Sequence, residues 1–179
     1  MIELYQTSTN GMTMFQSIVD ELGKANNMNT VYHSSVLDGT RRRIRKYYWV
    51  ELRKEKYFSI PESISLFAEV GEDGKARYRV SVEIDERNAN INQIEKHNSI
   101  LNLPVKDEYK YALGRKAAGE LLFVKNSAEA KNLICQEDYN KVQISVCVSY
   151  NQVKNNNNIG MILDEAIKSL VPFYLYTVE

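Results

Sequence analysis

Apolar and polar residues alternate along three neighbouring stretches of the chain, and a period of two predicts β-strands. The first stretch is 43–53, and the others are 63–70 and 76–85. One face of the first carries Ile44, Tyr48, Val50 and Leu52. Its opposite face carries Arg43, Arg45, Tyr47, Trp49, Glu51 and Arg53. The pattern predicts an antiparallel meander with one apolar face and one polar face.

The segment "GEDGK" between the second and third stretches predicts a hairpin turn, because its glycines can adopt positive φ. In the register that this turn favours, Glu69 lies opposite Arg77 and Phe67 lies opposite Arg79. We therefore expect charged and aromatic pairs across the polar face.

Helical spacing of apolar residues predicts four helices. They are expected at 12–27, 90–101, 127–134 and from Ile159 onward. Thr13 and Gln16 fit a capping box at the first, and Asn158 is a suitable N-cap for the last. The second helix is expected to bury Ile91, Ile94 and Leu101. Pro172 is expected to end or kink the last helix, because proline lacks the backbone N–H.

Residues 141–150 alternate cleanly and predict a further, half-buried strand, while "YKYAL" and "ELLFV" predict short ones. No internal repeat or linker divides the chain, so we expect one domain over residues 1–179. The predicted fold class is α+β. It is a mostly antiparallel sheet, with the meander near residues 43–85 plus strand 141–150, and helices pack on one face.

The composition is that of a soluble globular protein, with 44% hydrophobic and 26% charged residues. The N-terminus lacks the pattern of a signal peptide and no long apolar run occurs, so we expect a cytoplasmic protein without a membrane partner. Lys plus Arg and Asp plus Glu both total 23. Overall charge therefore gives no argument for a polyanion partner.

Standard catalytic motifs are absent from the sequence. It has no phosphate-binding loop and no nucleophile elbow, and its two histidines are far apart. Cys135 and Cys147 fit no metal-binding spacing and are expected to be reduced, structural thiols. We expect a binding protein rather than an enzyme, with no catalytic residue, metal or cofactor. One alternative stays open: a magnesium-dependent nuclease using Glu83 or Asp85 with Glu108 and Lys110.

The basic stretch is the strongest functional signal. Residues 41–56 contain eight basic side chains and only two acidic ones. Arginines can neutralise phosphates, and exposed aromatic rings can stack on bases. We therefore predict a nucleic-acid-binding surface, for DNA in the first place, on which the arginines project beside Trp49. Its residues are Arg41, Arg42, Arg43, Arg45, Lys46, Tyr47, Tyr48, Trp49, Arg53, Phe67, Arg77 and Arg79.

Two other interpretations of this stretch are open. Aromatic residues favour strands for packing reasons and arginines keep exposed strands soluble, so the face can be a solvated strand. Tyr and Arg are also enriched at protein interfaces, which fits a protein-interaction module such as an immunity or inhibitor protein.

The element order around "IPESISLFAEV", "YRVSVEI" and the closing "LVPFY" resembles the DNA-binding N-terminal domain of McrB-type modification-dependent restriction proteins. The resemblance implies an aromatic pocket for a flipped methylated cytosine, formed here from Tyr47, Tyr48, Trp49 or Phe67. It also implies a role in a bacterial defence or restriction system. The sequence departs from the family at Glu62, where an aromatic residue commonly follows the proline.

Overall fold

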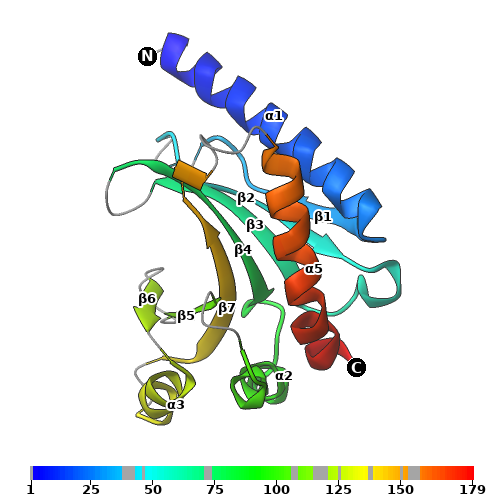
Figure 1. Ribbon diagram of the computed structural model, residues 1–179, viewed down its shortest axis with the longest axis vertical. Coiled ribbons are helices and arrows are strands. Elements are labelled where there is room, and N and C mark those ends of the chain that lie inside the picture. The colour runs from blue at the N-terminus through cyan, green and yellow to red at the C-terminus, as the bar shows by residue number, and fades with distance from the viewer. Residues whose placement is uncertain are drawn as a thin grey trace.

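The computed structural model describes residues 2–37, 43–45, 47–70, 74–105, 109–114, 121–124, 126–136, 139–149, 151–152 and 158–179, with side chains from Ser8 onward. A seven-stranded sheet forms its centre, in the order β1-β2-β3-β4-β7-β5-β6, and all neighbouring strands are antiparallel. The strands are β1 (Asn29–His33), β2 (Tyr47–Arg53), β3 (Glu62–Val70), β4 (Ala76–Ile84), β5 (Tyr109–Gly114), β6 (Leu121–Val124) and β7 (Lys141–Val148). The sheet is strongly curved, most visibly along β7 (Figure 1).

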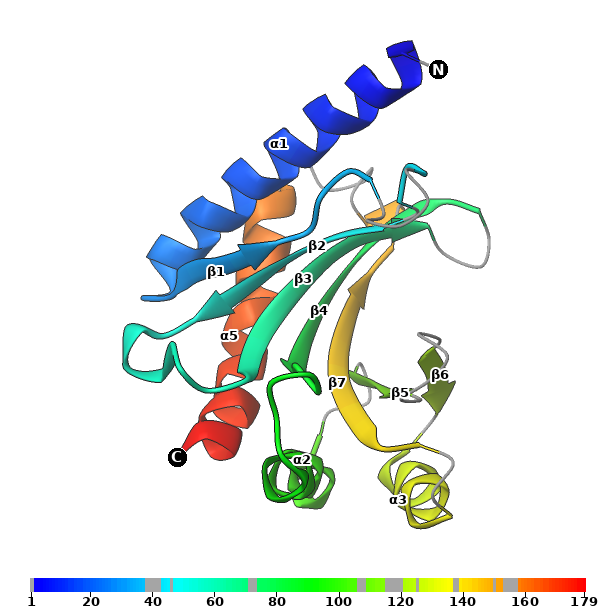
Figure 2. The same ribbon diagram turned by 180° about the vertical axis from the view of Figure 1, so that it is seen from behind.

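Four helices pack against the apolar face of this sheet. They are α1 (Ile2–Ala25), α2 (Ile91–Asn98), α3 (Ser127–Cys135) and α5 (Ile159–Val178), with short 3₁₀ helices η1 (Glu55–Tyr57) and η2 (Ser99–Asn102). α1 and α5 cross behind β1 to β4, and α2 and α3 lie below β7 and β5 (Figure 2). The predicted α+β class with an antiparallel sheet is confirmed.

Strand alternation builds the core. Val50 and Leu52 of β2 point toward the helices, as predicted, and are almost fully buried. They join a single apolar cluster with the inward residues of the other strands and with Leu163, Ile167 and Leu170 of α5. Burying one such side chain contributes about 1.5–3 kcal/mol, so this face is fixed by apolar burial. The opposite face is left to polar side chains.

The predicted hairpin register is confirmed. Glu69 pairs with Arg77 and Phe67 pairs with Arg79 across β3 and β4. On the other side of β3, Phe67 lies opposite Trp49 of β2. Because all these residues share one parity, they project from the same face of the sheet.

Several helix predictions were wrong in detail. α1 begins at Ile2, and Thr13 lies inside it, where its hydroxyl donates to the carbonyl of Thr9 at 3.0 Å. Ile91 opens α2 but is 66% exposed, because Asn90 caps the helix at the surface. α5 continues through Pro172 to Val178. α3 is capped by Asn126.

β7 was predicted as half-buried, but its centre is buried on both faces. Gln143 and Ser145, which alternation directs away from the core, have almost no exposed surface. The reason is that β7 is an inner strand and polar side chains of its neighbour β4 contact both residues: Arg79 and Glu83 bond to Gln143, and Ser81 bonds to Ser145.

His97 in α2 is fully buried. Its Nε2 lies 2.9 Å from the carbonyl oxygen of Val142, which identifies the neutral ring with Nε2–H as the donor. Burial lowers the pKa of His97, the hydrogen bond to Val142 raises it and the charge of Lys141 lowers it, and together they bring the pKa from 6.5 to about 4. The ring therefore stays neutral to a lower pH in the folded chain than in the unfolded chain.

We expect His97 to make folding stability fall as the pH drops. Between pH 6.5 and about 4 the unfolded chain takes up a proton that the folded chain does not. This linkage amounts to about 3 kcal/mol over the full range. Urea unfolding of the wild type and His97→Gln at pH 7, 6 and 5 measures it, since all other titrating groups are common to both. The stability difference between the two proteins should shrink toward acid pH, and a difference independent of pH would contradict the assignment.

Candidate functional site

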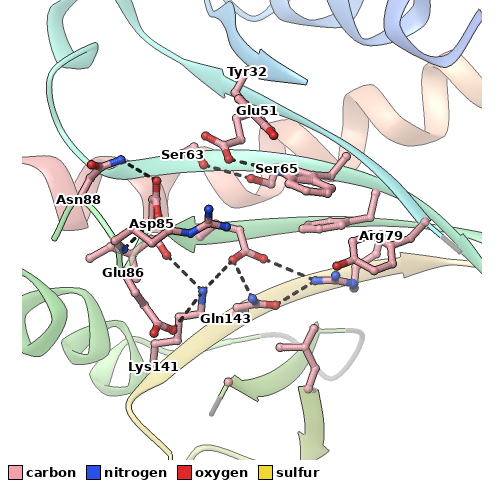
Figure 3. A pocket seen from close by; sticks show the side chains of 18 of the residues that line it. Tyr32, Glu51, Ser63, Ser65, Arg79, Asp85, Glu86, Asn88, Lys141 and Gln143 are labelled. Carbon is pink, nitrogen blue, oxygen red and sulfur yellow. Dashed lines mark hydrogen bonds and ion pairs between the residues drawn. The ribbon is translucent and has the colours of Figure 1, made fainter. Parts of the chain in front are cut away.

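The polar face of the sheet forms a half-open cavity of about 770 Å³. Its lining residues come from all seven strands and from the segment after β4. Figure 3 shows Glu51, Ser63 and Ser65 on one side of it and Lys141 and Gln143 of β7 on the other. A cavity of this size falls in the range of small-molecule sites.

Arg79 is the centre of the cavity floor. Its side chain is 2% exposed and stacks over the ring of Phe67, 3.8 Å from its centroid. Nη1 donates to Gln143 Oε1 at 2.9 Å and to Ser81 Oγ at 2.7 Å. Nε lies 3.3 Å from Glu69 Oε1, so the buried positive charge is neutralised within the protein.

Glu83 is the second buried charge of the floor. Gln143 Nε2 donates to its Oε2 at 2.7 Å, and the ammonium of Lys141 lies 3.7 Å from the same oxygen. Burial raises the pKa of Glu83, while Lys141 and Arg79 lower it. Lys141 also pairs with Glu86 at 3.3 Å. Each floor charge thus has a partner of opposite sign.

Hydroxyl groups fill the spaces between these charges. The hydroxyls of Ser63 and Ser65 are 3.0 Å apart, and those of Ser81 and Ser145 are 2.6 Å apart. All four serines are buried. Short side chains at these positions leave the volume of the cavity open, because a larger residue on the same face would fill it.

Aromatic side chains form the wall near β1 and β2. The Trp49 ring lies 5.6 Å from the ring of Tyr32 and 5.6 Å from that of Tyr47, measured between centroids. The guanidinium of Arg45 lies over the Trp49 ring, 5.3 Å from its centroid. Trp49 is part of the cavity lining, and a ring in this position can stack on a planar ligand.

The charges of the lining nearly cancel. Five acidic side chains, Glu51, Glu69, Glu83, Asp85 and Glu86, stand against four basic ones, Arg53, Arg79, Arg87 and Lys141. Since Arg79 and Lys141 are already paired with carboxylates, the interior offers an anion little attraction. The charge balance of the lining therefore favours an uncharged or cationic group over an anion.

The structure brings together five of the residues that the sequence predicted for binding. The cavity is lined by Trp49, Arg53, Phe67, Arg79 and Tyr47, the last 41% exposed. Arg77 lies beside them, paired with Glu69 at 2.8 Å and placed over the ring of Phe123. The expectation that Arg79 projects freely for a phosphate contact was wrong. Its neighbours Glu69 and Gln143 hold it in the floor instead.

The other predicted residues are not among the described residues of the lining. Arg43 is exposed and Arg45 is half-buried. Tyr48 points to the opposite face and packs against the core. Arg41, Arg42 and Lys46 lie outside the described residues.

Sequence reasoning missed the contribution of β7. Lys141 and Gln143 alternate with the core residues of this strand, which placed them on the polar face. Nothing in the sequence showed that β7 pairs with β4, where Ser81 meets Ser145 directly. The pairing of strands about 60 residues apart in the chain is a tertiary contact without a local signal.

Among the described residues, no group of three or more His, Cys, Asp and Glu side chains is arranged to hold a metal ion. Glu108, which the nuclease alternative requires, lies outside them. No helix in the described part of the chain combines the length and apolar character that crossing a membrane requires.

Comparisons with protein-family models, with curated proteins and with solved structures find no match. The resemblance to McrB-type domains therefore stays a prediction.

Removing Arg79 should destabilise the fold far more than removing its neighbour Arg77. Arg79→Ala leaves the buried Glu83 without one of its cations, and breaking a buried ion pair typically costs about 3–5 kcal/mol. Arg77 and Arg79 both pair with Glu69, but Arg77 is partly exposed. Arg77→Ala should therefore cost about 1 kcal/mol or less of folding stability. Chemical denaturation of both variants measures the difference. Equal losses would show that Arg79 does not neutralise the floor.

Proposed function

We propose that this chain binds nucleic acid, DNA in the first place, and seats one base in the cavity of the polar face. The observation that carries the proposal is the position of Trp49. This residue belongs to the basic and aromatic stretch of the sequence, and its ring lines a cavity whose floor holds amide, hydroxyl and carboxylate groups. An aromatic ring beside hydrogen-bonding groups suits a base, which is planar and polar.

The charge distribution supports a base inside the cavity and phosphates outside it. A base is uncharged, and the interior of the cavity has almost balanced charges. Phosphates carry negative charge and are met most readily by cations at the surface, which fits exposed Arg43 better than buried Arg79. The backbone would therefore run along the rim while the base enters the cavity.

Arg45 connects the two parts of this arrangement. In the structure its guanidinium covers the Trp49 ring at 5.3 Å and its Nε lacks a hydrogen-bond partner. A base that stacks on this ring would take the place of the guanidinium. Arg45 would then be free to meet the phosphate of the same nucleotide.

The finer parts of the proposal follow from the sequence resemblance. They are a modified base as the ligand, and a cytoplasmic bacterial defence or restriction system as the setting. Moving a base out of the stack costs less free energy when the base is damaged, mismatched or already single-stranded. Single strands are therefore the first substrates to test.

A protein-interaction module is the second candidate, and one observation favours it. Val31 and Tyr32 of the edge strand β1 and Tyr47 of β2 are large side chains with substantial exposure, clustered beside Trp49. Exposed aromatic groups at a sheet edge are typical of protein contact surfaces.

Salt-dependent binding of fluorescent single-stranded oligonucleotides tests the main proposal. The Arg43→Ala, Arg45→Ala double variant should lose two phosphate contacts and flatten the slope of log affinity against log salt by about 1.4 on single strands. Trp49→Ala should weaken binding by about 1–3 kcal/mol with little change in that slope, because stacking releases few counterions.

Thermal melting of each variant confirms that it remains folded. If neither single strands nor duplexes bind at low salt, the proposal is contradicted and the protein-interaction module is favoured. Binding that neither the arginine pair nor Trp49 affects would place the nucleic acid on another surface.

A further inference from the structure

Glu51 presents a carboxylate at the aromatic wall of the cavity. It lies two residues after Trp49 on β2 and so projects from the same face. Trp49 Nε1 donates to its Oε1 at 3.4 Å, and Arg53 Nη2 donates to its Oε2 at 3.4 Å. Both contacts are long for a charge-assisted hydrogen bond, which is normally 2.7–2.9 Å.

The other carboxylates of the lining each accept at least one hydrogen bond of ordinary length, although the second oxygen of Glu83 has no hydrogen-bond partner. Glu69 accepts from Arg77 at 2.8 Å, and Glu83 accepts from Gln143 at 2.7 Å. Asp85 accepts from Asn88 at 2.8 Å, and Glu86 accepts from Asn140 at 2.9 Å. Among the described carboxylates that line the cavity, Glu51 alone has no contact shorter than 3.4 Å.

The surroundings of Glu51 leave it in need of further donors. Arg53 is shared with the carbonyl oxygen of Phe58, to which it donates at 3.1 Å. Burial raises the pKa of Glu51, more than the charge of Arg53 lowers it. A carboxylate has about four acceptor positions, so two donors from a ligand can be added without displacing either protein contact.

We propose that Glu51 receives two adjacent N–H donors from a planar group stacked against Trp49. In a nucleic acid this group is the Watson–Crick edge of guanine, in place of the methylated cytosine that the sequence resemblance implies. To that extent the inference rests on the proposed function. Glu51 is then the residue that determines specificity, while Trp49 supplies stacking that any base can use.

The hydrogen-bonding edges of the bases explain the selection. Guanine places its N1–H and N2–H side by side, which matches the two oxygens of a carboxylate. Adenine and cytosine place an acceptor nitrogen beside the amino group, and thymine places its N–H between two carbonyls. Each of these edges sets a lone pair against Glu51. The ionised carboxylate accepts hydrogen bonds but cannot donate one, so these contacts are unfavourable. A well-formed bidentate contact discriminates by about fivefold to a hundredfold.

Four thymidine 9-mers that differ only in the central base, which is guanine, adenine, cytosine or thymine, test the inference by fluorescence anisotropy. The wild type should bind the guanine oligonucleotide at least about fivefold more tightly than the other three. Glu51→Gln should lose this preference and keep its affinity for the all-thymine strand. Glu95→Gln, an exposed glutamate of α2, is the matched control and should behave as the wild type.

Equal binding of all four strands by the wild type would overturn the inference and leave the proposed function standing. A guanine preference that Glu51→Gln retains would do the same. The wild-type comparison decides the first of these outcomes even if the variant does not fold.

Failure of every strand to bind would overturn the proposed function, and a second probe then decides on Glu51. Trp49 is the only tryptophan of the chain, so its fluorescence reports directly on this wall. Benzamidine, a planar group with paired N–H donors, should quench it where benzamide does not, and Glu51→Gln should abolish the effect. No response to benzamidine would overturn the inference as well.

Discussion

The buried guanidinium of Arg79 is the constraint on which the polar face depends. A cation that is 2% exposed is tolerated only with neighbouring negative charge and filled hydrogen-bonding positions. β3 supplies Glu69, β4 supplies Glu83 and Ser81, and β7 supplies Gln143. One side chain thus ties three strands together through polar contacts. This gives the face a fixed arrangement without an apolar core of its own.

The two faces of the sheet are stabilised by different means. Apolar burial against α1 and α5 holds one face, and a polar network holds the other. Curvature turns the polar face inward, so that its charges line a cavity where a flat sheet would expose them to water (Figure 2). Low exposure strengthens each interaction there. Glu51 has the longest contacts of the described carboxylates in the lining, 3.4 Å to both Trp49 and Arg53.

This arrangement places the described residues of the basic stretch in two different environments. Trp49 and Arg53 line the cavity, whereas Arg43 is exposed to solvent. The proposed binding mode follows from this division: the interior accepts an uncharged, planar group, and the rim meets the charged part of the same ligand. Of the described basic residues in this stretch, Arg53 lines the cavity and Arg43 is exposed outside its lining.

The sequence by itself determined the α+β class, the meander and the hairpin register that sets Glu69 against Arg77 and Phe67 against Arg79. These features are local, because alternation fixes the face of each residue and a short turn fixes the register. Sequence also identified Trp49 and the basic stretch around it. Only the tertiary structure decided that β7 pairs with β4, that Gln143 and Lys141 complete the floor, and that Arg79 is buried rather than exposed. The pairing of distant strands and the curvature of the sheet bring these groups together, and neither has a signature in the local order of residues.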